Sequence, residues 1–420
     1  MADSLDVYVN DTLAGNLQQR HGKLTFTYAP AWINSEAFMP LSVTMPPQSG
    51  KYSDDVARPF FENLLPEGEI RAAIAKLKQV SARNTFGLLE EIGGDCAGAV
   101  SLCPHGDAPQ KNLGYSIVSD KRLRKFLSHM EKRPLLMMDD EVRLSLAGAQ
   151  DKLPVYHDGT QIYLPRGSAP STHILKPGSR VYAQMPINEH FCMRLANTLG
   201  LLVPESRILR KPDPFYLIER YDRKRSKDKS ISRIQQIDFC QALNLPSSNK
   251  YEKEGGPSLE SCFNVIARYS AQPAVDRLRT IDWVIFNFLI GNADAHGKNL
   301  SLLITAKNVF LAPFYDLIST IVYRDLTTSL AMKIGGENRP DWIKARHWNA
   351  FAKISGANPR IVQSRMATLS KNIASAARTL LPVVARTQDE TATLDRICVE
   401  IEKRARQISL IVAPAKSASK

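Results

Sequence analysis

The spacing of apolar residues predicts that the chain begins with short strands. Apolar and polar residues alternate at residues 5–9 and again at residues 24–28, the pattern of strands with one buried face. Helical spacing follows at residues 58–78, and residues 97–103 predict another strand. A polar segment containing Pro and Gly then interrupts the pattern at residues 104–114. We therefore expect a β-rich first unit, which ends near residue 115.

Short apolar strands are predicted again from about residue 140, with one helix among them. The helix is expected at residues 188–200, where one face is apolar and Gly200 ends the pattern. From residue 235 to about 406 the spacing is mainly helical, with one strand pair around residues 300–314. The strands of this second pattern are predicted at residues 141–159, 161–165, 172–177 and 215–222. Strands followed by a largely helical region predict an α+β fold.

Composition is typical of a folded cytoplasmic protein. The chain of 420 residues is 44% hydrophobic and 23% charged, no apolar run reaches membrane-spanning length, and the N-terminus carries no basic-then-apolar pattern. Its six cysteines lack the CxxC spacing of zinc sites. We expect reduced thiols, a cytoplasmic location and no membrane partner.

The formal net charge is +13, and basic residues cluster at residues 120–133, 220–233 and 402–407. Such a charge favours contact with a polyanion such as nucleic acid or a nucleotide, although a solvated basic surface explains it equally well. The insert at residues 223–233 can face DNA, a protein substrate or only solvent, and the sequence leaves these alternatives open.

Polar residues gather directly after the apolar stretch 283–290. Asp294 and Asn299 stand five positions apart, and Asp316 follows after two apolar strands. In protein kinases an Asp and an Asn at this spacing serve as the base for the acceptor hydroxyl and as a magnesium ligand, and a later Asp holds the metal. The ordered set predicts a phosphoryl-transfer site, whereas Asp294 as a turn residue and Asp316 as a helix N-cap are the structural alternatives.

A phosphoryl-transfer site also needs positive charge on the nucleotide phosphates. Lys176 ends a predicted strand, and Glu189 in the following helix can pair with it or can complement the helix dipole. The small-residue turn at 145–152 offers backbone N–H groups to phosphate oxygens but has a single glycine. Strand 215–222 runs into a polar segment, where an adenine can bond the backbone around Glu219 and Tyr221.

With these motifs in this order, the chain resembles the HipA family of serine/threonine kinases, the toxins of bacterial type II toxin–antitoxin systems. The resemblance covers nearly the whole chain. Its N-terminal part rests on VYVNDTLAGNL (7–17), FFENLLPEGEIR (60–71) and EIGGDCAGAVSL (91–102). Its kinase part rests on SLAGAQDKLPV (145–155), THILKP (172–177), NEHFCMRLA (188–196), ERYDR (219–223), DFCQALNLPSSNKYEKEGGP (238–257), LIGNADAHGKN (289–299) and LAPFYDLIS (311–319).

The resemblance implies a two-lobed, protein-kinase-like core with a β-rich lobe, a helical lobe and an additional N-terminal module. The module would span residues 1–115, and the lobe with the phosphate loop and hinge residues 116–234. The helical lobe with the catalytic loop would span residues 235–410, and residues 411–420 would form a disordered tail.

The resemblance also implies a role for each site residue. Asp294 would be the catalytic base, with Asn299 and Asp316 as magnesium ligands. Ser145 would be the residue that the kinase phosphorylates on itself, and this modification would eject the phosphate loop and stop the kinase. Two further roles stay open: Lys298 can contact the transferring phosphate or only solvent, and His296 can have a role in the catalytic loop or, as the structural alternative, can cap the turn. The residues implied to bind ATP are Ser145, Leu146, Ala147, Gly148, Ala149, Gln150, Lys176, Glu219, Tyr221 and Lys298.

The family's substrates and partners would follow from the same resemblance. The implied substrate is an aminoacyl-tRNA synthetase, chiefly glutamyl-tRNA synthetase, whose phosphorylation inhibits translation and promotes growth arrest and persistence. The implied partner is a HipB-like helix-turn-helix antitoxin that binds operator DNA together with the toxin. Two other functions stay open: a small-molecule phosphotransferase of the aminoglycoside kind, and a pseudokinase that only binds the antitoxin–DNA complex.

Overall fold

The computed structural model describes residues 3–109, 114–129, 134–135, 145–148, 150–179, 181–211, 213–228 and 230–413. Residues 414–420 of the predicted tail lie outside them. The chain divides into two compact units, each built from several segments. The first unit comprises Met1–Pro177, Arg207–Lys250 and Ser301–Ala312, and the second comprises Gly178–Ser206, Tyr251–Leu300 and Pro313–Lys420.

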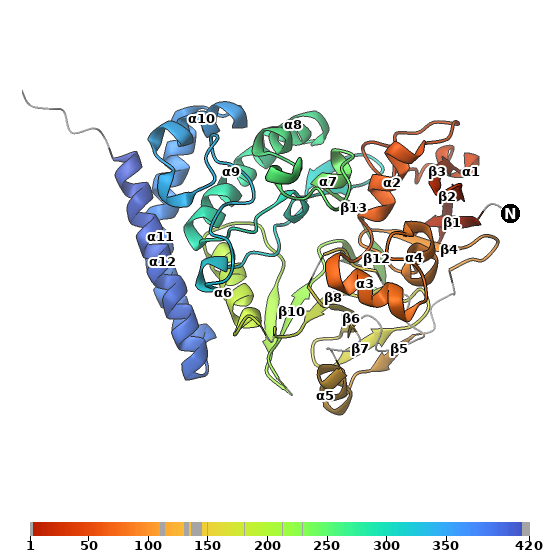
Figure 1. Ribbon diagram of the computed structural model, residues 1–420, viewed down its shortest axis with the longest axis horizontal. Helices are drawn as coiled ribbons and strands as arrows, with labels where there is room; N and C mark the ends of the chain where they lie inside the picture. Colours follow the sequence, from red (N-terminus) through yellow and green to blue (C-terminus); the bar gives the residue numbers. More distant parts are fainter. Residues whose placement is uncertain are drawn as a thin grey trace, which may run out of the picture. The chain divides into compact units, whose positions relative to one another are not determined.

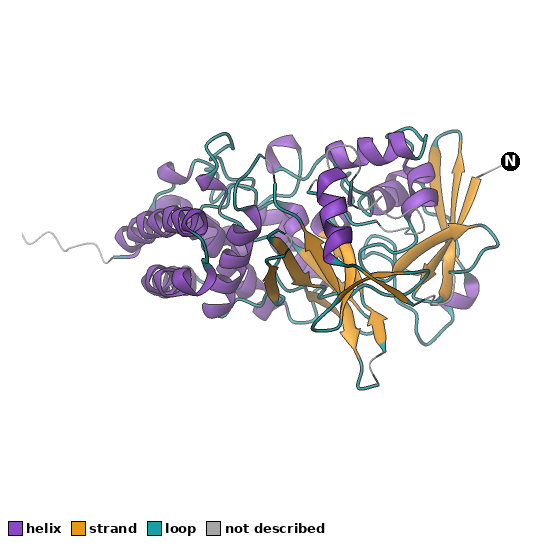
Figure 2. Ribbon diagram, turned by 90° about the horizontal axis from the view of Figure 1, so that it is seen from below, coloured by secondary structure: helices purple, strands orange, loops and turns teal. Residues whose placement is uncertain are grey.

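Sheets dominate the first unit, and helices dominate the second (Figure 2). The strands are β1 (Asp3–Val9), β2 (Thr12–Arg20), β3 (Lys23–Tyr28), β4 (Val100–Pro104), β5 (Tyr115–Ile117), β6 (Leu153–His157), β7 (Ile162–Pro165), β8 (His173–Lys176), β9 (Ser206–Leu209), β10 (Phe215–Glu219), β11 (Arg223–Arg225), β12 (Ile231–Arg233), β13 (Gln235–Asp238), β14 (Ser301–Ile304) and β15 (Val309–Leu311). Within the described residues these strands form four sheets, ordered β3-β2-β1-β4, β5-β7-β6-β8-β10-β9, β11-β12 and β13-β14-β15.

Helices accompany the sheets of the first unit. They are α1 (Pro30–Ile33), α2 (Asp54–Glu62), α3 (Gly68–Leu77), α4 (Thr85–Ile92), α5 (Asp120–His129) and α7 (Phe239–Ala242). Alternation on β1 buries Leu5, Val7 and Val9, each at most 2% exposed. Side chains from α5 and the six-stranded sheet form one continuous apolar cluster, whose members include Leu123, Phe126 and Val155.

The second unit contains the longest helices. They are α6 (Met185–Thr198), α8 (Leu259–Tyr269), α9 (Pro273–Ile290), α10 (Ala345–Ser355), α11 (Pro359–Val384) and α12 (Gln388–Val412). The last two lie side by side as an antiparallel pair (Figure 1). Helix α9 is buried almost all round through its last eight residues, as the apolar stretch 283–290 predicts. Among the described residues, no helix is both long and apolar enough to cross a bilayer.

The predicted α+β fold is confirmed, and most predicted strands and helices are present. The sequence pattern missed strands β2, β5, β9, β11, β12 and β13 and helices α1, α4 and α5. Strand β2 was missed because it has only a few buried positions in a polar stretch, and β13 because its sequence, QQID, carries a single apolar residue. All six cysteines are buried free thiols, as expected of reduced residues.

A buried ionic cluster joins the end of the N-terminal segment to the β10–β12 region within the first unit. Asp95 accepts from Arg233 Nε at 2.9 Å and from Arg223 Nη2 at 3.2 Å. Asp222 pairs with Arg220, with Nη2 2.6 Å from Oδ2. Burial raises the pKa of the Asp95 carboxyl, but the three guanidinium groups outweigh it, so the net shift is downward. The carboxylate is therefore held in its charged form.

Replacing Asp95 by asparagine is expected to destabilise the first unit by about 3–5 kcal/mol, because three buried guanidinium groups would then share one carboxylate. The matched control is Asp341→Asn, which removes an exposed ion pair with Lys403 and should cost less than about 1 kcal/mol. Urea unfolding of the two variants beside the wild type measures both values. Equal midpoints for the two variants would contradict a stabilising role of the cluster.

Candidate active site

Asp294 lies directly after the C-terminus of the buried helix α9. The helix ends at Gly291, whose φ of 69° is left-handed and whose added Cβ would come within 2.7 Å of Ile321. Glycine is therefore required where the chain turns out of the core. Asp294 itself is exposed, so a buried helix presents one carboxylate to the surface of its unit.

Hydrogen bonds fix the turn between α9 and Asp294. The Ala293 N–H donates to Thr320 Oγ1 at 2.8 Å, and the Thr320 hydroxyl donates to Gly291 O at 3.2 Å. The Asn292 side chain accepts from the Asp294 N–H at 3.0 Å. The backbone that carries the carboxylate is thus held by neighbours from within the second unit.

Asn299 and Asp316 meet in the same unit, as the sequence predicted for a shared site. Asn299 Nδ2 lies 3.1 Å from Asp316 Oδ2, and the Asn299 Oδ1 accepts from the His296 N–H at 2.9 Å. Asp316 has φ 59°, a left-handed conformation that is uncommon for a residue with a side chain. Such outliers concentrate at functional sites.

The Asn299–Asp316 pair contains the oxygen types that magnesium takes as ligands, but here the Asn299 amide turns Nδ2 toward Asp316 and Oδ1 toward the His296 N–H, so it would have to reorient to bind the ion through Oδ1. One carboxylate and one amide oxygen are hard ligands of the kind that Mg²⁺ takes when substrate phosphates complete its shell. Within the described part of the chain, no three or more His, Cys, Asp and Glu side chains gather into a metal cluster. A magnesium ion that also binds substrate phosphates does not need all of its ligands from the protein. One carboxylate and one amide oxygen are therefore the right kinds of protein ligand for it.

His296 and Lys298 flank Asn299 in a short 3-10 helix, Gly297–Asn299. His296 is its N-cap and is 6% exposed, which agrees with the structural alternative for this residue. Lys298 is also 6% exposed. This burial does not fit the alternative of a solvent-facing Lys298. The contact of Lys298 with a phosphate stays a prediction.

Lys176 is the last residue of β8 in the first unit. It pairs in register with Tyr216 of β10, and its Nζ lies 5.6 Å from the centre of the Tyr216 ring. The side chain is buried, at 7% exposure, so its ammonium is desolvated. Its predicted partner Glu189 is also buried, at 2%, but belongs to helix α6 of the second unit. The Lys176–Glu189 pair therefore stays a prediction.

The predicted phosphate loop packs against backbone of the N-terminal segment. Ser145 is fully buried, its Oγ donates to Leu64 O at 2.7 Å, and its N–H donates to Asp95 O at 3.0 Å. Gly148 has φ 109° and accepts from the Glu67 N–H at 3.1 Å. Leu146, Ala147 and Gln150 belong to the same irregular segment, and Ala149 lies outside the described residues.

Glu219 and Tyr221 alternate along the chain with Arg220 and Asp222, two residues of the buried ionic cluster. Glu219 ends β10 and is exposed, whereas Arg220 and Asp222 point into the cluster. Tyr221 donates its hydroxyl to Gln236 Oε1. Residues 220–223 form a turn in which the Arg223 N–H donates to Arg220 O at 3.3 Å, and the anchored side chains of Arg220 and Asp222 hold this turn in place. The contact of Glu219 and Tyr221 with an adenine is untested.

Two residues at the site were not found from the sequence. Tyr251 donates its hydroxyl to Asp294 Oδ1 at 2.7 Å. The Asn188 side chain bridges α6 to the segment after Asp316, donating to Ser319 O at 2.9 Å and accepting from the Ser319 N–H at 3.0 Å. Both residues stand in the motifs that carry the family resemblance, which was the available indication of a role.

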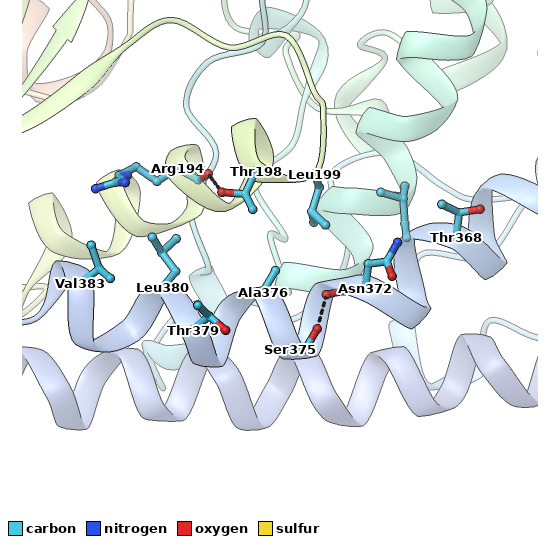
Figure 3. A pocket seen from close by; sticks show the side chains of 11 residues that line it. Arg194, Thr198, Leu199, Thr368, Asn372, Ser375, Ala376, Thr379, Leu380 and Val383 are labelled. Atoms are coloured by element: carbon cyan, nitrogen blue, oxygen red, sulfur yellow. Dashed lines mark hydrogen bonds between the residues drawn. The ribbon is translucent and has the colours of Figure 1, made fainter.

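A separate groove of about 510 Å³ runs between α6 and α11, and none of the predicted site residues lines it (Figure 3). Its polar side chains include Thr198 and Ser375, whose hydroxyls donate to carbonyls of their own helices. Because no residue predicted for phosphoryl transfer lines the groove, it is not part of the candidate site.

Comparison with known proteins identifies the family. Residues 5–103 match the HipA N-terminal domain, and residues 144–378, more than half of the chain, match the HipA-like C-terminal domain. The chain belongs to the HipA family. It is 31% identical to the serine/threonine-protein kinase toxin HipA of Shewanella oneidensis over 93% of this chain and 92% of that protein.

Further relatives agree with a kinase of the HipA family. Y4mE of Sinorhizobium fredii, named as a candidate kinase, is 37% identical over 97% of this chain and 99% of its own length. A chain in the solved complex of Shewanella oneidensis MR-1 HipA, HipB and operator DNA superimposes with a TM-score of 0.87 at 29% identity, over 97% of this chain and 98% of that one. The α+β fold is thus the kinase-like fold of HipA.

Proposed function

We propose that this HipA-family chain is an ATP- and magnesium-dependent serine/threonine protein kinase. The observation that carries the proposal is the placement of Asp294, Asn299 and Asp316 in one unit, with the last two side chains 3.1 Å apart. A base for the acceptor hydroxyl and ligands for magnesium are parts that protein kinases use besides the groups that bind the nucleotide.

In the proposed reaction the acceptor hydroxyl attacks the γ-phosphorus of ATP. A new P–O bond forms, the bond to the β–γ bridging oxygen breaks, ADP leaves, and Asp294 takes the hydroxyl proton. Asn299 and Asp316 would hold magnesium, which neutralises charge on the phosphates when bound. Lys176, Lys298 and the loop of Ser145–Gln150 would bind the phosphates, and Glu219 and Tyr221 would flank the adenine.

The proposed substrate is glutamyl-tRNA synthetase, and the proposed partner is a HipB-like antitoxin on operator DNA. The partner is supported by the solved relative, which is a complex with HipB and operator DNA. The net charge of +13 fits proximity to DNA phosphates. The substrate rests on family resemblance alone. Its consequence would be inhibited translation and growth arrest, the action of a toxin.

Incubation of the purified protein with γ-labelled ATP, magnesium, glutamyl-tRNA synthetase and its tRNA tests the substrate. Label on the synthetase supports it. Label only on the kinase itself would refute the synthetase while keeping the kinase. ATP binding without label on any protein, from an unphosphorylated start, would favour a pseudokinase, and label on an added aminoglycoside would favour a small-molecule phosphotransferase.

We also propose Ser145 as the autophosphorylated residue. Its hydroxyl is completely buried and bonded to Leu64 O, so a phosphate of charge about −2 does not fit where the side chain now lies. Phosphorylation should therefore displace the loop and stop the kinase. Phosphopeptide mapping after ATP–magnesium incubation should find phosphate on Ser145, with the exposed Ser232→Ala variant as a control that keeps it. Phosphate found solely at other residues would refute this proposal.

A further inference from the structure

The predicted catalytic carboxylate is already hydrogen bonded by a tyrosine of its own unit. Tyr251 Oη lies 2.7 Å from Asp294 Oδ1, at hydrogen-bond distance. Within the described residues, the structure gives no hydrogen bond to the other oxygen, Oδ2. One carboxylate oxygen is thus occupied, and the second is available to an acceptor hydroxyl.

Tyr251 is itself held in place from two sides. Its carbonyl accepts from the Glu254 and Gly256 N–H groups, each at 2.9 Å, which closes the turn that follows it. Its ring meets the His296 ring edge-on, with centroids 5.2 Å apart and planes at 77°. The Tyr251 hydroxyl is therefore held in position by this hydrogen-bonded turn and by the His296 ring of the catalytic loop.

The turn at residues 251–257 is also tied to the backbone beside Asp294. Glu252 N–H donates to Ala331 O at 3.3 Å, and Ala331 N–H donates to Ala293 O at 3.0 Å. Pro257 lies so close to Gly297 that a Cβ on that glycine would come within 2.3 Å of the proline ring. The glycine thus permits the close approach of the turn to the catalytic loop.

We propose that Tyr251 is the positioning residue of Asp294. Rotation of an aspartate about χ2 is soft, so a carboxylate bonded only through its solvent shell samples many orientations. A hydroxyl fixed on Oδ1 sets the direction of Oδ2 as well, and a hydrogen bond to a charged acceptor is stronger than a neutral one. The inference rests on the proposed function, because it assigns Tyr251 to the base of that reaction.

The test is Tyr251→Phe, which keeps the ring against His296 and removes only the hydroxyl. The rate of phosphate transfer from γ-labelled ATP to the protein at saturating ATP should fall about 10- to 100-fold, the effect of a misplaced reacting group. The ATP concentration at half-maximal rate and the melting temperature should not change. Tyr269→Phe, which removes another tyrosine hydroxyl of the same unit, is the matched control and should keep full activity.

A double variant separates positioning from a general structural role. Combined with Asp294→Ala, the Tyr251→Phe change should cause no further loss, because no carboxylate remains to be positioned. Full activity of Tyr251→Phe, an additive loss in the double variant, or phosphate on Tyr251 itself would overturn the inference and leave the kinase intact. A wild-type protein that transfers no phosphate would overturn the proposed function and this inference together.

Discussion

Replacing Asp294 by alanine is expected to lower phosphate transfer by about 100- to 10,000-fold, the usual contribution of a positioned general base. The residue is the exposed carboxylate at the end of a buried helix, on a backbone fixed by Thr320 and Asn292. Removing its side chain breaks one hydrogen bond, to Tyr251, and leaves the turn intact. The loss should therefore be one of chemistry and not of folding.

Single-turnover transfer and nucleotide titration measure the two consequences of this change separately. The rate should fall while the Kd for ATP stays within about threefold, because the base acts on the acceptor and not on the nucleotide. Asp341→Ala, which removes an exposed carboxylate of the same unit, should leave both values unchanged. A parallel loss of ATP binding and thermal stability in Asp294→Ala would assign the residue to structure.

Replacing Asp316 by asparagine is expected to lower the rate by about 100-fold or more, because a metal ion's charge stabilisation amounts to several kcal/mol. Asparagine is the informative replacement. Asp316 has φ 59°, a conformation that asparagine tolerates and alanine does not, so the backbone is preserved while the charge is removed.

The rate of Asp316→Asn measured against magnesium concentration distinguishes a metal ligand from a structural residue. The variant should need more magnesium for half-maximal rate, and the Asn299→Ala variant should shift in the same direction, since the two side chains meet at 3.1 Å. An unchanged magnesium dependence in both variants would contradict their role as ligands.

Local pattern was sufficient to predict the elements that carry the site. The apolar stretch before Gly291 predicts the buried helix α9, whereas the burial of the polar residues His296 and Lys298 after it does not follow from the pattern. Alternating apolar residues predict β6, β8 and β10, and thereby the strand that ends at Lys176. These predictions succeed because the order of apolar and polar residues within a segment determines whether one face or the whole segment is buried.

Contacts between distant residues were not predictable in this way. Ser145 bonds Leu64 across 81 positions, and Tyr251 bonds Asp294 across 43. In strand β13 the buried Gln235 side chain donates to Leu41 O at 2.6 Å and accepts from the Ala99 N–H at 3.0 Å, so distant residues satisfy it. A local pattern contains no information on such partners, since a buried polar residue depends on what the rest of the fold brings to it.

The contacts of Ser145 connect the HipA N-terminal domain to the predicted phosphate loop. Residues 5–103 match that domain, and carbonyls of Leu64 and Asp95 from within it accept both hydrogen bonds of Ser145. The Glu67 N–H adds a third hydrogen bond, to Gly148 O. The N-terminal domain therefore contributes to the position of the loop, besides any part it has in binding a partner.

We infer above all that this chain transfers phosphate by using Asp294. The most direct measurement is label incorporation from γ-labelled ATP with magnesium into unphosphorylated wild-type protein and into Asp294→Ala, with ATP binding measured on both. We expect the labelling rate of the variant to be at least about 100-fold below that of the wild type, with a Kd for ATP within about threefold. Equal labelling of the two proteins, or a wild type that binds ATP and takes up no label, would contradict the claim.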